Sequence, residues 1–153
     1  MAEENFAGNI IVVLANLPDF LRTPILKKRM IEFFTMDELE KKQLINNALD
    51  AGPTIPFSNF SKLFKTWLEI LTVLPEDQRD GLFSAYINEI SDSPQKLIAF
   101  HLDGILEIFL SLDNEKQMII SQSVKKIINS LENEKKRKLL IIIPDNAQKY
   151  LKF

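Results

Sequence analysis

Residues that favour the first turn of a helix recur every nineteen positions along this chain of 153 residues. Proline suits that turn because its missing amide hydrogen would be unpaired there, and acidic side chains suit it because they complement the helix dipole. The seven positions are Pro18, Asp37, Pro56, Pro75, Pro94, Asp113 and Glu132. This spacing predicts one helical unit that is used about eight times.

Apolar residues keep the same register, as a repeat requires, because each unit must bury the same face. Seven residues after the seven starts stand Ile25, Leu44, Leu63, Leu82, His101, Ile120 and Leu139. Apolar residues also recur eight, eleven, twelve, fifteen and eighteen residues after most starts. These offsets form the stripe of an amphipathic helix and do not fit the alternation of a strand.

The pattern predicts an all-α protein with a single helical domain over residues 1–153. Its units are residues 1–17, 18–36, 37–55, 56–74, 75–93, 94–112, 113–131 and 132–153. Each unit has room for one helix and a short turn, so successive helices are expected to run antiparallel and to pair as 38-residue hairpins. About eight antiparallel helices of this kind form either a short α-solenoid or a closed helical bundle.

The period of 38 residues resembles that of helical-hairpin repeat proteins, the HEAT- and TPR-like arrays, whose units span about 34 or about 40–47 residues. The resemblance lies in period and pattern. It implies a stack of helical hairpins in which each unit contacts its neighbours.

Two departures from the pattern are predicted to interrupt helices. The run from Asp50 to Pro56 forms the widest loop and a candidate hinge, in which Gly52 can adopt the left-handed cap and Pro53 blocks continuation of the helix. Pro144 falls in the middle of the last unit, so the helix from Glu132 is expected to stop near Ile142 and a short helix to follow.

Composition is typical of a globular protein, with 46% hydrophobic and 26% charged residues. The absence of cysteine excludes disulfides and thiolate metal sites. The longest apolar runs, Ile10–Ala15 and Leu139–Ile143, are far shorter than the roughly 20 residues of a membrane span. The acidic start Met1–Glu4 is unlike a secretory signal, and together these features favour a cytoplasmic protein.

Charge is unevenly distributed along the chain. Residues 75–112 carry a net charge of −5, whereas residues 113–153 carry +4. The basic residues that stand out in the last two units are Lys125, Lys126, Lys135, Lys136, Arg137 and Lys138. Such a cluster could contact nucleic acid, an acidic partner or anionic lipid, but the sequence pI of about 5.5 favours a solvated helix face.

His101 is the only histidine, so a zinc or di-iron site that needs two imidazoles cannot form within one chain. Asp103 and Glu107, four residues apart, share one helix face and are weak candidates for a polar site together with His101. On an ideal helix, side chains that are two residues apart point in very different directions, so His101 and Asp103 diverge. This favours a structural role for the histidine. No phosphate loop, dinucleotide fingerprint or serine nucleophile elbow is found, and no cofactor is expected.

Aromatic residues are densest after the widest loop, where Phe57, Phe60 and Phe64 stand close together. Their spacing is that of a core stripe, but an exposed apolar groove, if present, is expected there. The leading hypothesis is a non-enzymatic scaffold that binds a protein or peptide, a second copy of the chain included. The alternatives are a nucleic-acid-associated protein that uses the basic cluster, and a ligand-binding or enzymatic bundle around His101.

Overall fold

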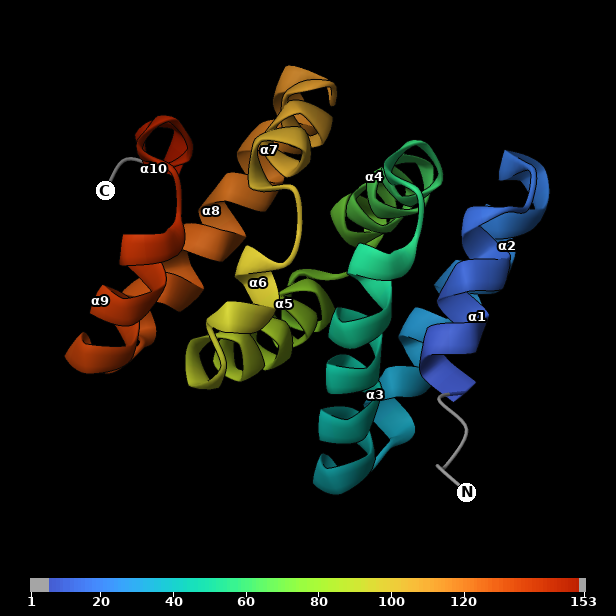
Figure 1. Cartoon of the computed structure of the whole chain (residues 1–153), viewed down its shortest axis with the longest axis horizontal. Helices are drawn as coiled ribbons and strands as arrows, with labels where there is room; N and C mark the ends of the chain where they lie inside the picture. The colour runs from blue at the N-terminus through green and yellow to red at the C-terminus, as the bar shows by residue number, and fades with distance from the viewer. Residues whose placement is uncertain (1–5, 152–153) are drawn as a thin grey trace.

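The computed structural model describes residues 6–151, and within them all regular structure is helical. The α-helices are α1 (Phe6–Ala15), α2 (Asp19–Glu32), α3 (Glu38–Ala51), α4 (Phe57–Val73), α5 (Glu76–Asp92), α6 (Gln95–Ile98), α7 (Leu102–Leu110), α8 (Asn114–Ser130), α9 (Asn133–Ile142) and α10 (Asp145–Leu151). Short 3-10 turns, η1 (Phe33–Thr35) and η2 (Gly52–Thr54), extend α2 and α3. The helices follow one another along the longest axis, from α1 and α2 at one end to α9 and α10 at the other (Figure 1).

A helix begins immediately after each of the seven recurring positions. Pro18, Asp37, Pro56, Pro75, Pro94, Asp113 and Glu132 are the N-cap residues of α2, α3, α4, α5, α6, α8 and α9. Asp37 forms a capping box, because its Oδ1 accepts from the Glu40 amide at 2.8 Å while the Glu40 carboxylate accepts from the Asp37 amide. Asp113 likewise accepts from the Lys116 amide at 2.9 Å.

The described residues contain ten α-helices rather than about eight, because two units are broken. The break at Pro144 lies between α9 and α10, where the sequence predicts it. The break at residues 99–101, between α6 and α7, is not predicted by the sequence pattern. It places His101 before the first turn of α7, which removes that residue from the apolar column of its unit.

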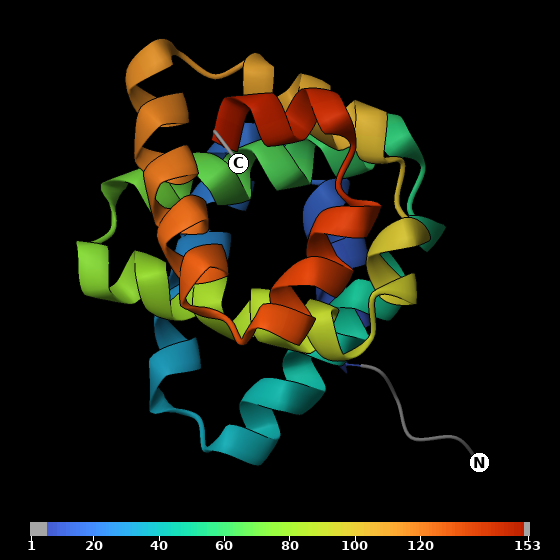
Figure 2. The same cartoon turned by 90° about the vertical axis from the view of Figure 1, so that its left-hand side faces the viewer.

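Contacts between successive units do not dominate the packing, as the predicted 38-residue hairpins would require. Most helices pack against the second or third unit along the chain instead of the next one: α1 contacts α3 and α4, α3 contacts α5, α4 contacts α7 and α8, and α5 contacts α8 and α9. Seen along the long axis, the helices lie around that axis rather than in two flat layers (Figure 2). Contacts between successive units join α1 to α2, α5 to α6 and α8 to α10, so only some turns bring a helix back onto its predecessor.

Two arginines hold the junctions between helices in the same way, 57 residues apart. Arg22 donates to the carbonyl oxygens of Leu14 and Leu17, which end α1, and to Thr66 Oγ1 at 3.4 Å. The residues that Arg79 contacts lie 57 positions further along: it donates to the carbonyls of Leu71 and Leu74, which end α4, and to Ser123 Oγ at 3.1 Å. Fifty-seven residues are three units of nineteen, so the two junctions stand three units apart.

Two glutamines likewise donate hydrogen bonds to helix-end carbonyls at later junctions. Gln117 donates its amide hydrogens to the carbonyls of Leu110 and Leu112, and Gln148 to those of Leu140 and Ile143. The junction donors are Arg22, Arg79, Gln117 and Gln148, and each stands four residues after the residue that directly precedes its helix. They pair carbonyl groups that a helix end leaves without intrahelical partners.

Gly52 does not form the left-handed cap that the sequence predicts, and its φ of −51° is that of a right-handed helix. Its lack of a side chain has another reason. A Cβ at this position would lie 2.5 Å from the Phe100 ring, so glycine lets that ring pack against η2. The segment expected to be a hinge is thus a 3-10 turn held by an aromatic ring.

Candidate functional site

The three aromatic residues predicted to border a groove form part of one continuous row of rings. Phe60 stacks on Phe64 at 5.6 Å between centroids, and Phe64 stacks on Trp67 at 5.9 Å. Phe57 is 39% exposed, whereas Phe60 is buried. The row therefore belongs mainly to the core, and one of its members, Phe64, also lines a cavity described next.

An apolar pocket of about 210 Å³ lies between α4, α6, α7, α8 and the start of α10. All but one of its lining residues are apolar: Phe64, Leu68, Leu97, Leu102, Ile105, Leu106, Phe109, Ile120, Ser121, Val124, Ile143, Pro144 and Ala147. The Ser121 hydroxyl is occupied locally, since it donates to the Met118 carbonyl at 3.2 Å. The wall therefore offers apolar contact and little hydrogen bonding.

The two breaks that interrupt units within residues 6–151 both lie at this pocket. Leu97 precedes the break between α6 and α7 and Leu102 follows it, while Ile143 and Pro144 form the break between α9 and α10. A continuous helix in either unit would place its apolar stripe against neighbouring helices instead. The broken units thus turn apolar residues toward a space that no described side chain fills.

An aromatic ring closely approaches the backbone at the first turn of α7. A Cβ on Gly104 would lie 2.3 Å from Phe57 Cζ and 2.8 Å from His101 Nδ1. The His101 ring meets Phe57 edge to face, with centroids 5.1 Å apart. Glycine at position 104 therefore allows Phe57 to pack on the first turn of α7.

The structure does not gather the three polar candidates into an enclosed site. Asp103 and Glu107 are exposed on α7, and His101 is exposed at its N-cap, where its ring lies against Phe57. Within residues 6–151, no group of three or more histidine and carboxylate side chains is arranged to hold a metal ion. What the three residues offer is a solvated, weakly acidic helix face.

Part of the basic cluster is paired with the acidic middle of the chain. Lys126 binds Glu76 at 3.2 Å and also Asp80, and Lys135 binds Asp92 at 3.3 Å. These ion pairs join α8 and α9 to α5, so opposite charges that are remote in sequence meet in space. Burial raises the pKa of Asp80, but hydrogen bonds from Lys126 and Ser123 outweigh burial and hold that pKa below its ordinary 3.8.

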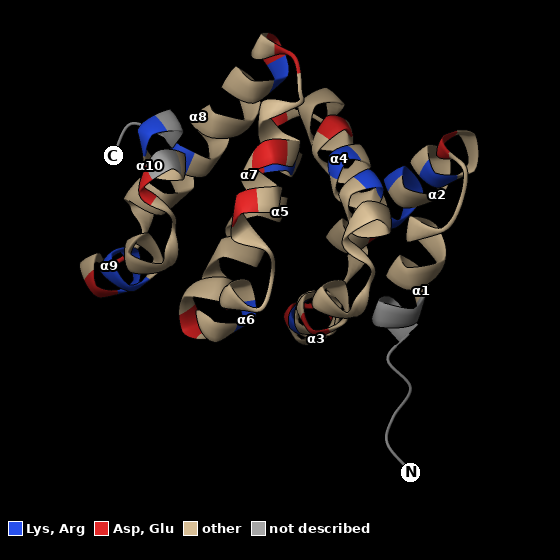
Figure 3. Ribbon diagram, turned by 45° about the horizontal axis from the view of Figure 1, so that its top comes forward, with Lys and Arg blue, Asp and Glu red and all other residues tan. Residues whose placement is uncertain are grey.

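The remaining basic candidates are spread over α8 and α9. Lys138 pairs with Glu134 on its own helix at 3.5 Å, and Lys136 donates to Asn129 at 2.8 Å. Lys125 lies half-buried on α8 and Arg137 is exposed on α9. Figure 3 shows acidic and basic segments interspersed over most helices, α9 included, rather than one basic field.

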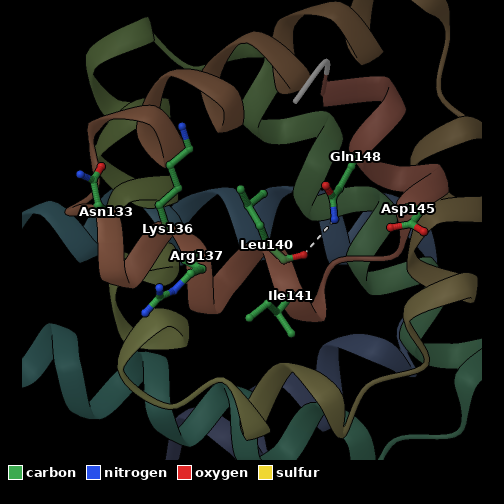
Figure 4. Close-up of a pocket in the computed structure, with 7 residues that line it drawn as sticks. All are labelled: Asn133, Lys136, Arg137, Leu140, Ile141, Asp145 and Gln148. Atoms are coloured by element: carbon green, nitrogen blue, oxygen red, sulfur yellow. Dashed lines mark hydrogen bonds between the residues drawn. The ribbon is translucent and has the colours of Figure 1, made fainter.

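A second, shallow pocket lies between α9 and α10, lined by Asn133, Lys136, Arg137, Leu140, Ile141, Asp145 and Gln148. The cationic ends of Lys136 and Arg137 point in different directions, and the Gln148 amide is occupied by the Leu140 carbonyl (Figure 4). The polar side chains of this pocket are therefore not arranged to bind one anion together.

Sequence reasoning missed most residues of the apolar pocket. Leu97, Leu102, Val124 and Ile143 occupy ordinary apolar positions, and their shared cavity depends on which helix faces meet. The one available signal was the departure from the repeat at His101 and Pro144.

Comparison with protein-family models, with curated proteins and with solved structures finds no match for this chain. Among the described residues, no helix combines the length and the apolar character needed to span a bilayer.

Proposed function

We propose that this chain is a short α-solenoid that acts as a non-enzymatic interaction protein, with the apolar pocket as its binding site for a peptide segment of a protein partner. The observation that carries the proposal is the pocket itself. Twelve apolar residues line it, and it lies at the breaks between α6 and α7 and between α9 and α10. The recurrence of the Arg22 junction at Arg79 supports the solenoid arrangement, because equivalent helices then make equivalent contacts.

The pocket has the size of one large side chain. An engineered apolar cavity of about 150 Å³ in another protein stays dry and binds benzene. A pocket of about 210 Å³ therefore accepts a phenylalanine, a leucine or a comparable apolar side chain. Such an anchor is typical of grooves that hold a helix or an extended peptide, where one buried side chain supplies most of the affinity.

Filling the pocket tests the proposal. Val124→Phe on α8 places a ring in the cavity, and peptides from a display library selected on the unaltered protein provide the probe. We expect selected peptides to share a Phe, Leu or Trp anchor and to lose at least about tenfold in affinity for the variant, since the anchor no longer fits. Val73→Phe, at an exposed site on α4, is the matched control.

Two results would contradict the proposal. One is a set of selected peptides without an apolar anchor, and the other is unchanged affinity in a Val124→Phe protein that keeps its helical circular dichroism. Binding of nucleic acid that disappears on reversal of charge at Lys135, Lys136, Arg137 and Lys138 and weakens steeply with salt would favour the alternative function.

A further inference from the structure

The helix α2 exposes large apolar side chains on its outer face. Phe20 is 76% exposed, and Leu21, Ile25 and Ile31 are each 39–44% exposed. The opposite face of the same helix is buried through Leu26 and its neighbours, which pack toward α4. A surface helix normally presents a polar outer face, so apolar residues on both faces indicate a second contact surface.

The helix that lies 57 residues further on shows what covers the equivalent face. On α5, Gly81 is the counterpart of Pro24 and faces the Phe34 ring of η1. A Cβ at position 81 would lie 3.4 Å from that ring. Glu89, the counterpart of Glu32, accepts a hydrogen bond from Asn46 of α3 at 2.7 Å. The face of α5 between these two contacts is therefore covered by α3 and η1.

Burial differs accordingly between equivalent positions. Leu82 of α5 is 2% exposed, whereas its counterpart Ile25 is 39% exposed. Ile70 of α4 is 3% exposed, whereas its counterpart Val13 on α1 is 58% exposed. Among the described helices, α2 has no counterpart of the contact that α3 makes with α5, yet Val13 and Ile25 are both β-branched apolar residues. A repeat that ends an array normally has a polar outer surface instead.

Charge distinguishes the α2 face from its counterpart. Lys27, Lys28 and Arg29 are exposed on α2, where α5 has the uncharged Ser84, Ala85 and Tyr86. Arg29 pairs with Glu32 at 3.2 Å, and the two lysines flank the apolar residues. A partner that covers this face therefore needs apolar residues on one side and acidic residues beside them.

We propose that the outer face of α2, together with Val13 of α1, binds an acidic amphipathic helix of another protein, in the position that α3 takes on α5. A second copy stacked end to end would bring α9, which carries four cations and one glutamate, toward Lys27 and Lys28, so net like charge opposes that arrangement. This surface lies at the end of the molecule away from the apolar pocket, so each proposal can fail without the other (Figure 1).

The test uses two synthetic, stapled helices of nineteen residues that share one leucine stripe and differ only in flanking residues, which are glutamates in one and lysines in the other. Fluorescence anisotropy measures their affinity for the full chain. We expect the glutamate helix to bind at least tenfold more tightly. Ile25→Ser is expected to weaken it at least tenfold, and the double variant Lys27→Glu, Lys28→Glu to reverse the preference between the two helices.

Leu39→Ser is the matched control, because Leu39 on α3 is 65% exposed and lies outside the proposed surface. All variants are compared at equal helical content by circular dichroism. Equal binding of the two helices, or a loss in Leu39→Ser as large as that in Ile25→Ser, overturns the proposal. So does binding to phosphatidylserine vesicles instead of either helix, and so does a dimer in solution that Ile25→Ser dissociates.

Discussion

At some positions of this protein, close contacts between helices determine which residue type fits. Gly52 and Gly104 leave room for the rings of Phe100 and Phe57, and both contacts join segments almost fifty residues apart. A sequence pattern can mark a glycine as a helix breaker, but it does not identify the ring that requires it. Gly52 accordingly has helical φ and ψ, and its conformational freedom is not what the structure uses.

Gly104→Ala is expected to lower the free energy of unfolding by about 1–3 kcal/mol, because a methyl group would overlap the Phe57 ring and overpack the site. Gly81→Ala is the control. Its Cβ would make an ordinary contact of 3.4 Å with Phe34, and alanine favours the helix by about 0.5–1 kcal/mol over glycine. Urea denaturation measures both values, and a stabilised Gly104→Ala protein would refute the argument.

Tyr86 provides a second test at this scale, since burial raises the pKa of its phenol to about 12. The raised pKa means that folding favours the neutral phenol. The contribution of Tyr86 to stability is thus complete below the ordinary pKa of 10.0 and is lost as the pH rises toward 12. Absorbance at 295 nm should show a late ionisation phase that Tyr86→Phe removes. Ionisation of every tyrosine near pH 10 in the folded protein would show that Tyr86 is accessible to water.

Most helices begin where the sequence predicts, but most of the helices that they pack against are not the ones that it predicts. The caps are local signals: Asp37 and Asp113 bond to amides three residues away, so the starts can be identified from the sequence alone. Packing partners depend instead on the direction of each turn. The junction donors bind carbonyls at these turns, and their equal spacing from each helix start becomes meaningful only once those carbonyls are known.

Arg79→Met is expected to cost about 1–3 kcal/mol of stability, because it leaves the carbonyls of Leu71 and Leu74 without their donor while keeping an apolar stem. Arg29→Met removes an exposed pair with Glu32 and should change stability by less than about 1 kcal/mol. Thermal and urea unfolding compare the two variants. Equal stability in both would show that the junction bond contributes nothing beyond a surface ion pair.

The molecule as a whole joins an acidic middle to a basic end. The sequence shows the charge difference between residues 75–112 and 113–153 but not that α5 faces α8 and α9. The apolar pocket escapes sequence analysis for the same reason, because its walls come from helices that are far apart along the chain. The sequence analysis expected an apolar groove at Phe57, Phe60 and Phe64; of these only Phe64 lines the pocket, whose location, size and other lining residues required the structure.

Acid should loosen the contact between α5 and α8. Because the pKa of Asp80 is depressed in the folded state, its contribution to stability is present above pH 3.8 and is lost as the pH falls through the lowered value. The melting temperature of the unaltered protein should therefore fall more steeply below pH 3.8 than that of Asp80→Asn. Asp77→Asn, at an exposed neighbouring carboxyl, should retain the steep fall; equally shallow profiles in all three would contradict this role.

The long reach of the packing contacts has a consequence for biosynthesis. Hydrogen bonds that join non-adjacent helices span 43–50 residues, so a helix that leaves the ribosome waits for at least two more units before its apolar face is covered. At about 5–20 residues per second, nineteen residues take roughly 1–4 s, whereas a helix forms within about a microsecond. Nascent chains of this protein thus leave apolar segments unburied for seconds while their helices form and melt, and translation speed sets the time available for a chaperone to bind them.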